Sequence, residues 1–181
     1  MAAFMFKYES EGFGWARVKM CAGAQSIEFH ASYIGRNPME SMLEALVWMK
    51  FEDDDSRFYM SSEPGELRVT MEKDGDDVHI QVDECDQFVS DYHQIKEGQW
   101  AKKLETTVLF DRLIEVVIKE AERNLLLHGM VGFSEDWCGH MDVFPMSAYL
   151  RLKGVDFTVE EGDQKRSSLT LELTILQDLL R

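Results

Sequence analysis

The stretch of the chain that decides its fold class is LRVTMEKDGDDVHIQV, residues 67–82. Apolar residues alternate with polar ones on both sides of its centre, which is the period of a strand with one buried face. Between the two runs, residues 73–76 carry an Asp-Gly pair, which tolerates the positive φ values of a tight turn. The stretch is therefore predicted to form a β-hairpin whose apolar side chains share one face: Leu67, Val69, Met71, Val78, Ile80 and Val82.

Upstream of this hairpin, the pattern combines strands with one helix. Apolar residues spaced by two predict a strand near residues 58–60 and further strands in the first third of the chain, separated by glycine turns. A helix is predicted between these strand regions, because Asn37 can cap it, Pro38 suits its first position and Glu40 stands three residues after the cap. It should run to about Lys50, with a methionine-rich apolar stripe on its core face.

Downstream of the hairpin, a second helix is predicted over residues 107–128. Apolar residues recur there at three- and four-residue spacing, and Gly129 can end the helix. A short helix is predicted over 145–152, and alternating residues predict a last hairpin within 155–175. Residues 176–181 fit either a strand or a helical turn.

This order of elements predicts an α+β fold, in which an antiparallel or mixed β-sheet carries the two main helices on one face. A parallel doubly wound fold would need more regular alternation and longer crossovers. The sequence has no Pro, Gly or Ser linker and no internal repeat, so residues 1–181 are expected to form a single domain.

Composition disfavours several classes of function. The formal net charge of -15 argues against binding to nucleic acid or to an anionic membrane, because both require a basic surface. No apolar run approaches the ~18 residues of a membrane span, and the first residues do not resemble a secretory signal. We therefore expect a cytoplasmic protein whose three widely spaced cysteines stay reduced.

Most of the negative charge is local. Residues 52–91 hold fourteen acidic residues against three basic ones, which is a net charge of -11. A solvated loop and the polar faces of strands would explain this charge without a function. An acidic surface also accelerates the encounter with a basic protein partner by electrostatic steering. On that hypothesis, the residues expected to bind the partner are Asp53, Asp54, Asp55, Glu63, Glu66, Asp74, Asp76, Asp77 and Trp137.

The acidic residues do not have the spacing of a metal site. The Asp-Gly-Asp-Asp run at 74–77 lacks the alternating ligands and the terminal glutamate of a calcium loop. The sequence also lacks the phosphate-binding, nucleophile-elbow and zinc-protease motifs. We therefore expect no catalytic residues, no metal and no cofactor.

Two alternatives remain open from the sequence. One is an enzyme in which Cys138 works with His140 or His128, as a thiol nucleophile or as a zinc site. The other is a structural or accessory protein. The aromatic loop that carries Trp137, together with Phe133 and Phe144, could cover one end of the sheet or form a hot spot at an interface.

Two resemblances bear on function. Residues 63–69 and 74–80, with the later 110–127 helix and the Phe144-Pro145 pair, resemble a recurrent pattern in small bacterial proteins to which no activity is attached. In size, acidity and lack of catalytic motifs, the chain is also similar to immunity proteins of bacterial contact-dependent and polymorphic toxin systems. That similarity implies a cytosolic protein that neutralises a toxin domain, often a basic nuclease, by occluding its active site.

Overall fold

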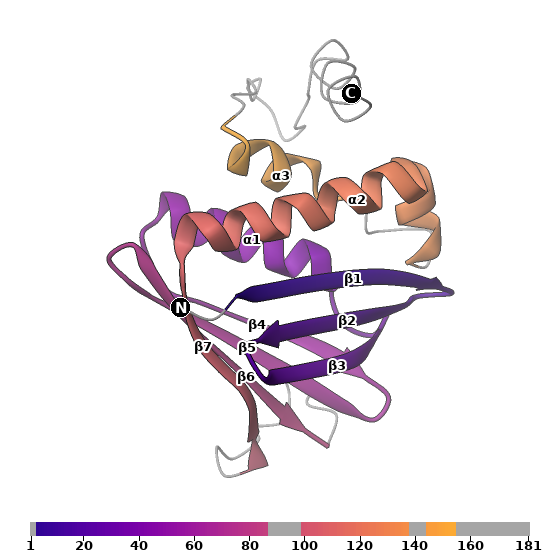
Figure 1. The fold of residues 1–181 in the computed structure, drawn as a ribbon. Helices are drawn as coiled ribbons and strands as arrows, with labels where there is room; N and C mark the ends of the chain where they lie inside the picture. Colours follow the sequence, from indigo (N-terminus) through magenta and orange to yellow (C-terminus); the bar gives the residue numbers. More distant parts are fainter. Residues whose placement is uncertain (1–2, 87–98, 138–143, 155–181) are drawn as a thin grey trace.

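The computed structural model describes residues 3–86, 99–137 and 144–154, which form two antiparallel sheets and three helices (Figure 1). The first sheet consists, in order, of β1 (Phe4–Gly12), β2 (Trp15–Ala22) and β3 (Gln25–Ser32). The second consists, in order, of β4 (Ser56–Ser62), β5 (Gly65–Asp74), β6 (Asp77–Cys85) and β7 (Ala101–Leu109). The helices are α1 (Pro38–Phe51), α2 (Phe110–Asp136) and α3 (Met146–Leu152). The predicted α+β class is confirmed in its antiparallel form, with two sheets in place of one.

The predicted central hairpin is formed by β5 and β6. Asp74 pairs with Asp77 at its tip, and Gly75 between them has a φ of 62°. A left-handed backbone of this kind costs glycine little, because glycine has no Cβ. The six apolar residues predicted to share one face of the hairpin are all buried. The period-two pattern therefore located both strands and their buried face.

Helix α1 begins as the sequence predicts. The Asn37 side-chain oxygen accepts hydrogen bonds from the backbone N–H groups of Met39 at 2.8 Å and Glu40 at 3.4 Å, and Pro38 opens the helix. Asn37 is fully buried, and its Nδ2 donates a hydrogen bond to the Tyr8 hydroxyl at 3.0 Å. The cap therefore satisfies the free N–H groups of the helix start and also joins α1 to β1.

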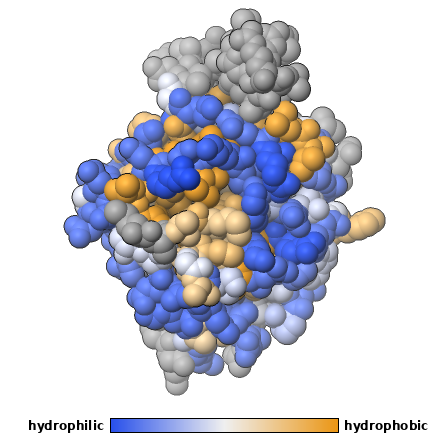
Figure 2. Space-filling view, viewed as in Figure 1, coloured by the Kyte–Doolittle hydropathy of each residue, from blue (hydrophilic) through white to orange (hydrophobic). Residues whose placement is uncertain are grey.

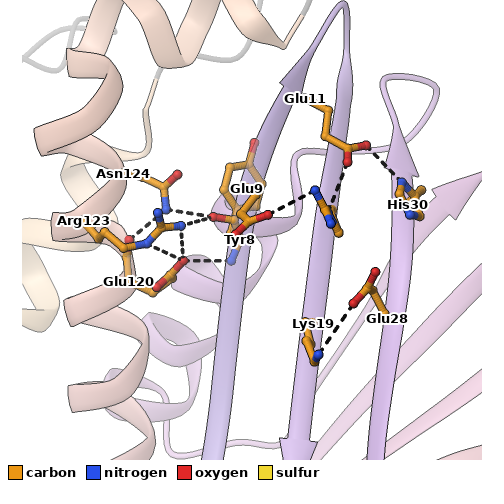
Figure 3. A network of polar contacts seen from close by, with 10 residues as sticks. Tyr8, Glu9, Glu11, Lys19, Glu28, His30, Glu120, Arg123 and Asn124 are labelled. Atoms are coloured by element: carbon orange, nitrogen blue, oxygen red, sulfur yellow. Dashed lines mark hydrogen bonds and ion pairs between the residues drawn. The ribbon is translucent and has the colours of Figure 1, made fainter.

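Helix α2 covers the outer edge of β1 with its side chains (Figure 3). Glu120, which is buried, accepts hydrogen bonds from the Tyr8 backbone N–H at 2.9 Å and from Lys7 Nζ at 3.0 Å. The Tyr8 carbonyl accepts from Arg123 at 2.6 Å and from Asn124 at 3.2 Å. Uncovered, these edge groups would be available to pair with another strand, so α2 takes the place of a neighbouring strand here.

The two sheets meet along β3. At its start, the Gln25 side-chain oxygen accepts a hydrogen bond from the Glu105 N–H of β7 at 2.8 Å. Beyond its end, Gly35 lies so close to β4 that a Cβ there would come within 2.8 Å of Ser61 Oγ. Strand β3 thus contacts both edge strands of the second sheet. Buried residues from both sheets and all three helices form one core cluster.

Between residues 99 and 137, the bounds of the strand and the helix differ from those predicted. Residues 107–109 were predicted as the start of a helix, but they end β7, which pairs with β6. Strand β7 buries few apolar side chains, chiefly Leu104 and Val108, so its own alternation is weak beside the strong helical period that follows. The span of α2 reaches Asp136, but Gly129, with φ 63° and ψ -178°, divides it into two helices, so the first of them ends where the sequence predicted.

The predicted short helix is confirmed as α3, and Gly154 follows it with a φ of 73°. The predicted last hairpin within 155–175, and the end at 176–181, lie outside the described residues. Most of the surface seen in Figure 2 is hydrophilic, with hydrophobic residues gathered near α2 and over one end of the three-stranded sheet. Among the described helices, none has the length and the apolar character needed to cross a membrane.

Candidate functional site

The structure brings most of the predicted acidic residues to one end of the four-stranded sheet. The loop at residues 52–55 leads from α1 into β4, and the β5–β6 turn lies beside it because Ser56 pairs with Met71. All the carboxylates of this region are exposed except that of Asp77, which is half-buried. We call this set the acidic end: Glu52, Asp53, Asp54, Asp55, Asp74, Asp76 and Asp77.

Lys73 joins the two segments of the acidic end. Its Nζ pairs with the Asp53 carboxylate, and its backbone N–H donates a hydrogen bond to Asp55 Oδ1 at 2.8 Å. The same Nζ lies 5.3 Å from the ring centroid of Phe110, and the Phe110 N–H donates to the Asp76 carbonyl at 2.8 Å. Lys73 contributes one positive charge against seven carboxylates, so the acidic end keeps a strongly negative potential.

Three predicted partner-binding residues lie elsewhere. Glu63 is exposed in the β4–β5 turn, at the opposite end of the sheet from the acidic end. Glu66 is only 4% exposed, and it accepts a hydrogen bond from Ser61 Oγ at 3.0 Å. Trp137 is 3% exposed and belongs to the core. Glu66 and Trp137 are therefore interior groups, and Glu63 lies on a different surface.

The core that contains Trp137 also holds a series of packed aromatic rings. The Phe133 ring lies 5.7 Å from that of Tyr8 and 5.3 Å from that of Phe144, which in turn lies 5.9 Å from Tyr149. Offset and edge-to-face rings at these distances pack favourably in protein cores. Phe133, Trp137 and Phe144 are all buried, which does not fit an exposed hot spot at an interface. Residues 138–143 of this segment lie outside the described residues.

The alternative enzymatic site is described only in part. Cys138 and His140 lie outside the described residues. His128 Nδ1 lies 3.2 Å from Asp136 Oδ2, across the interruption at Gly129. In the parts of the chain that the structure describes, no three His, Cys, Asp or Glu side chains are grouped as a metal site would require. The cysteines described there, Cys21 and Cys85, carry free thiols.

A polar hollow on the outer face of the four-stranded sheet was missed by the sequence reasoning. It encloses about 230 Å³ and is lined by Arg57, Arg68, Thr70, Glu72, His79 and Gln81. Arg68 is buried there and pairs with the buried Asp83 at 2.9 Å. The Trp100 ring centroid lies 4.7 Å from the Arg68 guanidinium. The hairpin register places Arg68 opposite Asp83, and that pairing of opposite charges was the signal available in the sequence.

Two exposed aromatic residues beside the acidic end were also missed. Trp48 and Phe51 lie at the end of α1, directly before the 52–55 loop, and about half of each side chain is exposed. Trp48 lies outside the buried apolar stripe of the helix. Glu44 and Glu52 stand four residues before and four residues after Trp48, so all three lie on one face of the helix. Two charged residues on that face were the sign in the sequence that Trp48 points outward.

Comparisons with known proteins do not assign the chain to a family. No protein-family model matches it, and neither does any curated protein. A chain of the CdiA-CT/CdiI toxin and immunity complex from Enterobacter cloacae is similar in structure, with a TM-score of 0.42 and 12% sequence identity. The similarity covers 66% of this chain and 98% of the other. At that identity and TM-score, it establishes neither a family nor a function for this chain.

Proposed function

We propose that this chain is a binding protein whose acidic end docks a basic protein domain. The observation that carries the proposal is the convergence of seven carboxylates from two segments of the chain, joined by the single cation of Lys73. These segments are a loop and a hairpin tip outside the core, so their charges are presented to solvent. Such a surface raises the rate of encounter with a basic partner.

Within this class, we propose an immunity protein that neutralises a toxin domain by covering its basic active surface. A domain that acts on nucleic acid binds phosphates with lysine and arginine side chains. Closely spaced carboxylates offer the same cations a competing set of charge-assisted hydrogen bonds. The size and acidity that the chain shares with immunity proteins support this proposal.

The binding proposal is tested by affinity capture from an extract of the organism that encodes the chain. The wild-type chain is compared with D53N/D54N/D55N, which removes three exposed charges from the acidic end. A matched control, E9Q/E11Q/E28Q, removes three charges from the outer face of the three-stranded sheet. A captured protein is then purified, and its association rate with each variant is measured at several salt concentrations.

The expected partner has a basic surface. The acidic-end variant should associate with it more slowly and with a weaker dependence on salt, whereas the control variant should behave like the wild type. Equal association rates for all three chains would overturn the proposed surface. The immunity role is tested separately, because the partner expressed alone should stop growth and co-expression of this chain should restore it. A harmless partner would refute immunity while leaving binding intact.

A further inference from the structure

The C-terminal part of α1 presents two aromatic side chains to solvent. Trp48 is 52% exposed and Phe51 is 48% exposed, although the other large apolar side chains of α1 are buried. Residues three apart on a helix lie on the same side, so the two rings form one apolar surface. Aromatic residues of this size and exposure are the kind that anchor protein interfaces.

The charges around these rings are negative on the side of the acidic end. Glu44 and Glu52 stand one helical turn before and one turn after Trp48, and the acidic end continues from Glu52. Arg36 neutralises Glu44 at 2.8 Å. Glu52 has no ion pair among the described residues. Trp48 therefore lies on the helix between two glutamates, each one turn away, and this spacing favours a cation over an anion at its ring.

One of these rings, that of Phe51, already has cations of the same chain beside it. The guanidinium carbon of Arg151, from α3, lies 4.4 Å from the Phe51 ring centroid, and Lys50 Nζ lies 5.8 Å from the same ring. Both distances are within the range of a cation–π contact. By contrast, no described cation lies over Trp48. The Phe51 ring therefore already makes cation–π contacts within the chain, whereas the Trp48 ring makes none with a described residue.

From this arrangement, we propose that Trp48, Phe51 and Glu52 form an arginine-binding anchor for the basic partner. The inference rests on the proposed function and adds the chemistry of the contact. A guanidinium stacks on the indole face while its N–H groups donate to the neighbouring Glu52 carboxylate. Arginine is preferred over lysine, because its planar fork can stack and form a bidentate hydrogen bond at once.

The test uses two synthetic probes, octa-arginine and octa-lysine, and measures their Kd for the full chain by calorimetry. The variants are W48L and F51L, which keep apolar bulk but remove the ring, W48F, which keeps a ring, and D53N/D54N/D55N. The matched control is F13L, because Phe13 is a fully exposed aromatic residue in the β1–β2 turn. The thermal unfolding midpoint of each variant establishes that it is folded.

The wild-type chain should bind octa-arginine more tightly than octa-lysine. In W48L, the arginine Kd should rise roughly threefold to tenfold while the lysine Kd changes little, so the preference is lost. W48F should retain most of the preference and F13L all of it. The indole N–H resonance of Trp48, assigned by its loss in W48F, should shift on titration with octa-arginine.

The results that would refute the anchor differ from those that would refute the proposed function. If W48L and F51L keep the wild-type preference for arginine, the anchor is refuted, while weaker binding by D53N/D54N/D55N would still support the acidic end. If that triple variant binds both peptides as the wild type does, the proposed function fails instead. A wild-type dimer that dissociates on W48L substitution would show that a second copy of the chain covers the rings, and this too would overturn the anchor.

Discussion

The carboxylate of Glu120 on α2 accepts the backbone N–H of Tyr8 on β1 at 2.9 Å, so a helix side chain completes the hydrogen bonding of a sheet edge. Glu120 also pairs with Lys7 and Arg123, and its side chain is 3% exposed. Lys7 and Arg123 keep 45% and 34% of their side chains exposed, so the loss on breaking the contact falls mainly on Glu120 and the buried Tyr8 N–H. This contact therefore joins α2 to the first sheet with a sizeable free energy.

The substitution E120Q should lower the free energy of unfolding by about 2 kcal/mol, because the hydrogen bonds from cationic donors lose their charged acceptor. Urea denaturation measures the effect. E115Q is the control on the same helix, since the Glu115 side chain is 43% exposed and solvent screens its ion pairs with Arg112 and Lys119, which therefore contribute little to stability. Equal losses for the two variants would show that the Glu120 contact does not hold α2 in place.

Protonation of the Glu120 carboxylate should lower the free energy of unfolding at acid pH. Burial raises the pKa of Glu120, but hydrogen bonds from Arg123, the Tyr8 N–H and Lys7 outweigh it and hold the pKa below its ordinary value of 4.5. A carboxyl group whose folded pKa is lowered stabilises the fold above the unfolded pKa and loses that contribution as the pH falls through the folded pKa. The difference in unfolding free energy between wild type and E120Q should therefore be constant near neutral pH and shrink below pH 4.5. A difference independent of pH would contradict this assignment.

The buried cap of α1 predicts a second loss of stability. N37A removes the acceptor for the N–H groups of Met39 and Glu40 and the donor to the Tyr8 hydroxyl, and should cost about 2 kcal/mol. The double-mutant cycle with Y8F separates the two roles. We expect a coupling energy of about 0.5 to 1.5 kcal/mol between Asn37 and Tyr8. Strict additivity would show that the side-chain contact contributes nothing.

Lys73 should weaken the binding of basic ligands, because it is the cation of the acidic end. K73Q should tighten the binding of octa-lysine roughly twofold to threefold at low salt and steepen the salt dependence. The ion pair it removes is partly exposed, so the free energy of unfolding should fall by less than about 1 kcal/mol. K119Q, on the exposed face of α2, serves as the control and should change the Kd less. Weaker binding by K73Q would mean that Lys73 contacts the ligand favourably.

Arg151 should compete with an incoming arginine, because it already stacks on Phe51. R151Q removes this cation and should lower the Kd for octa-arginine roughly twofold, with a smaller effect on octa-lysine. The control is R112Q, which removes an arginine that pairs with Glu115 on the surface of α2. If R112Q and R151Q tighten the binding of both peptides equally, net charge alone explains the gain.

Local patterns predicted those parts of the fold that depend on neighbours in the sequence. The β5–β6 hairpin and the start of α1 were found because an Asp-Gly turn and an Asn-Pro cap act within a few residues. Strand β7 was missed because only Leu104 and Val108 of its side chains are buried, so its alternation is weak beside the helical period that follows. The division into two sheets depends on where β3 meets β4 and β7, which no local pattern encodes.

The candidate site was predictable to a similar degree. Asp53 to Asp55 and Asp74 to Asp77 lie at one end of the sheet because β4 follows one group and the hairpin turn contains the other. Glu66 and Trp137 were expected to bind the partner, but Glu66 is buried beside Ser61 and Trp137 is buried in the core, and this burial depends on tertiary packing. A high density of acidic residues in a sequence thus predicts an acidic surface, but it does not predict which of these residues are buried.

The construction of the acidic end also bears on how this protein can change. Its carboxylates sit on a loop and a hairpin tip, and the core beneath is formed by other residues, such as Val69, Met71 and Ile80. Loop positions tolerate replacement far better than close-packed interiors. Single substitutions can therefore change the charge of this surface during evolution while the fold beneath it stays the same.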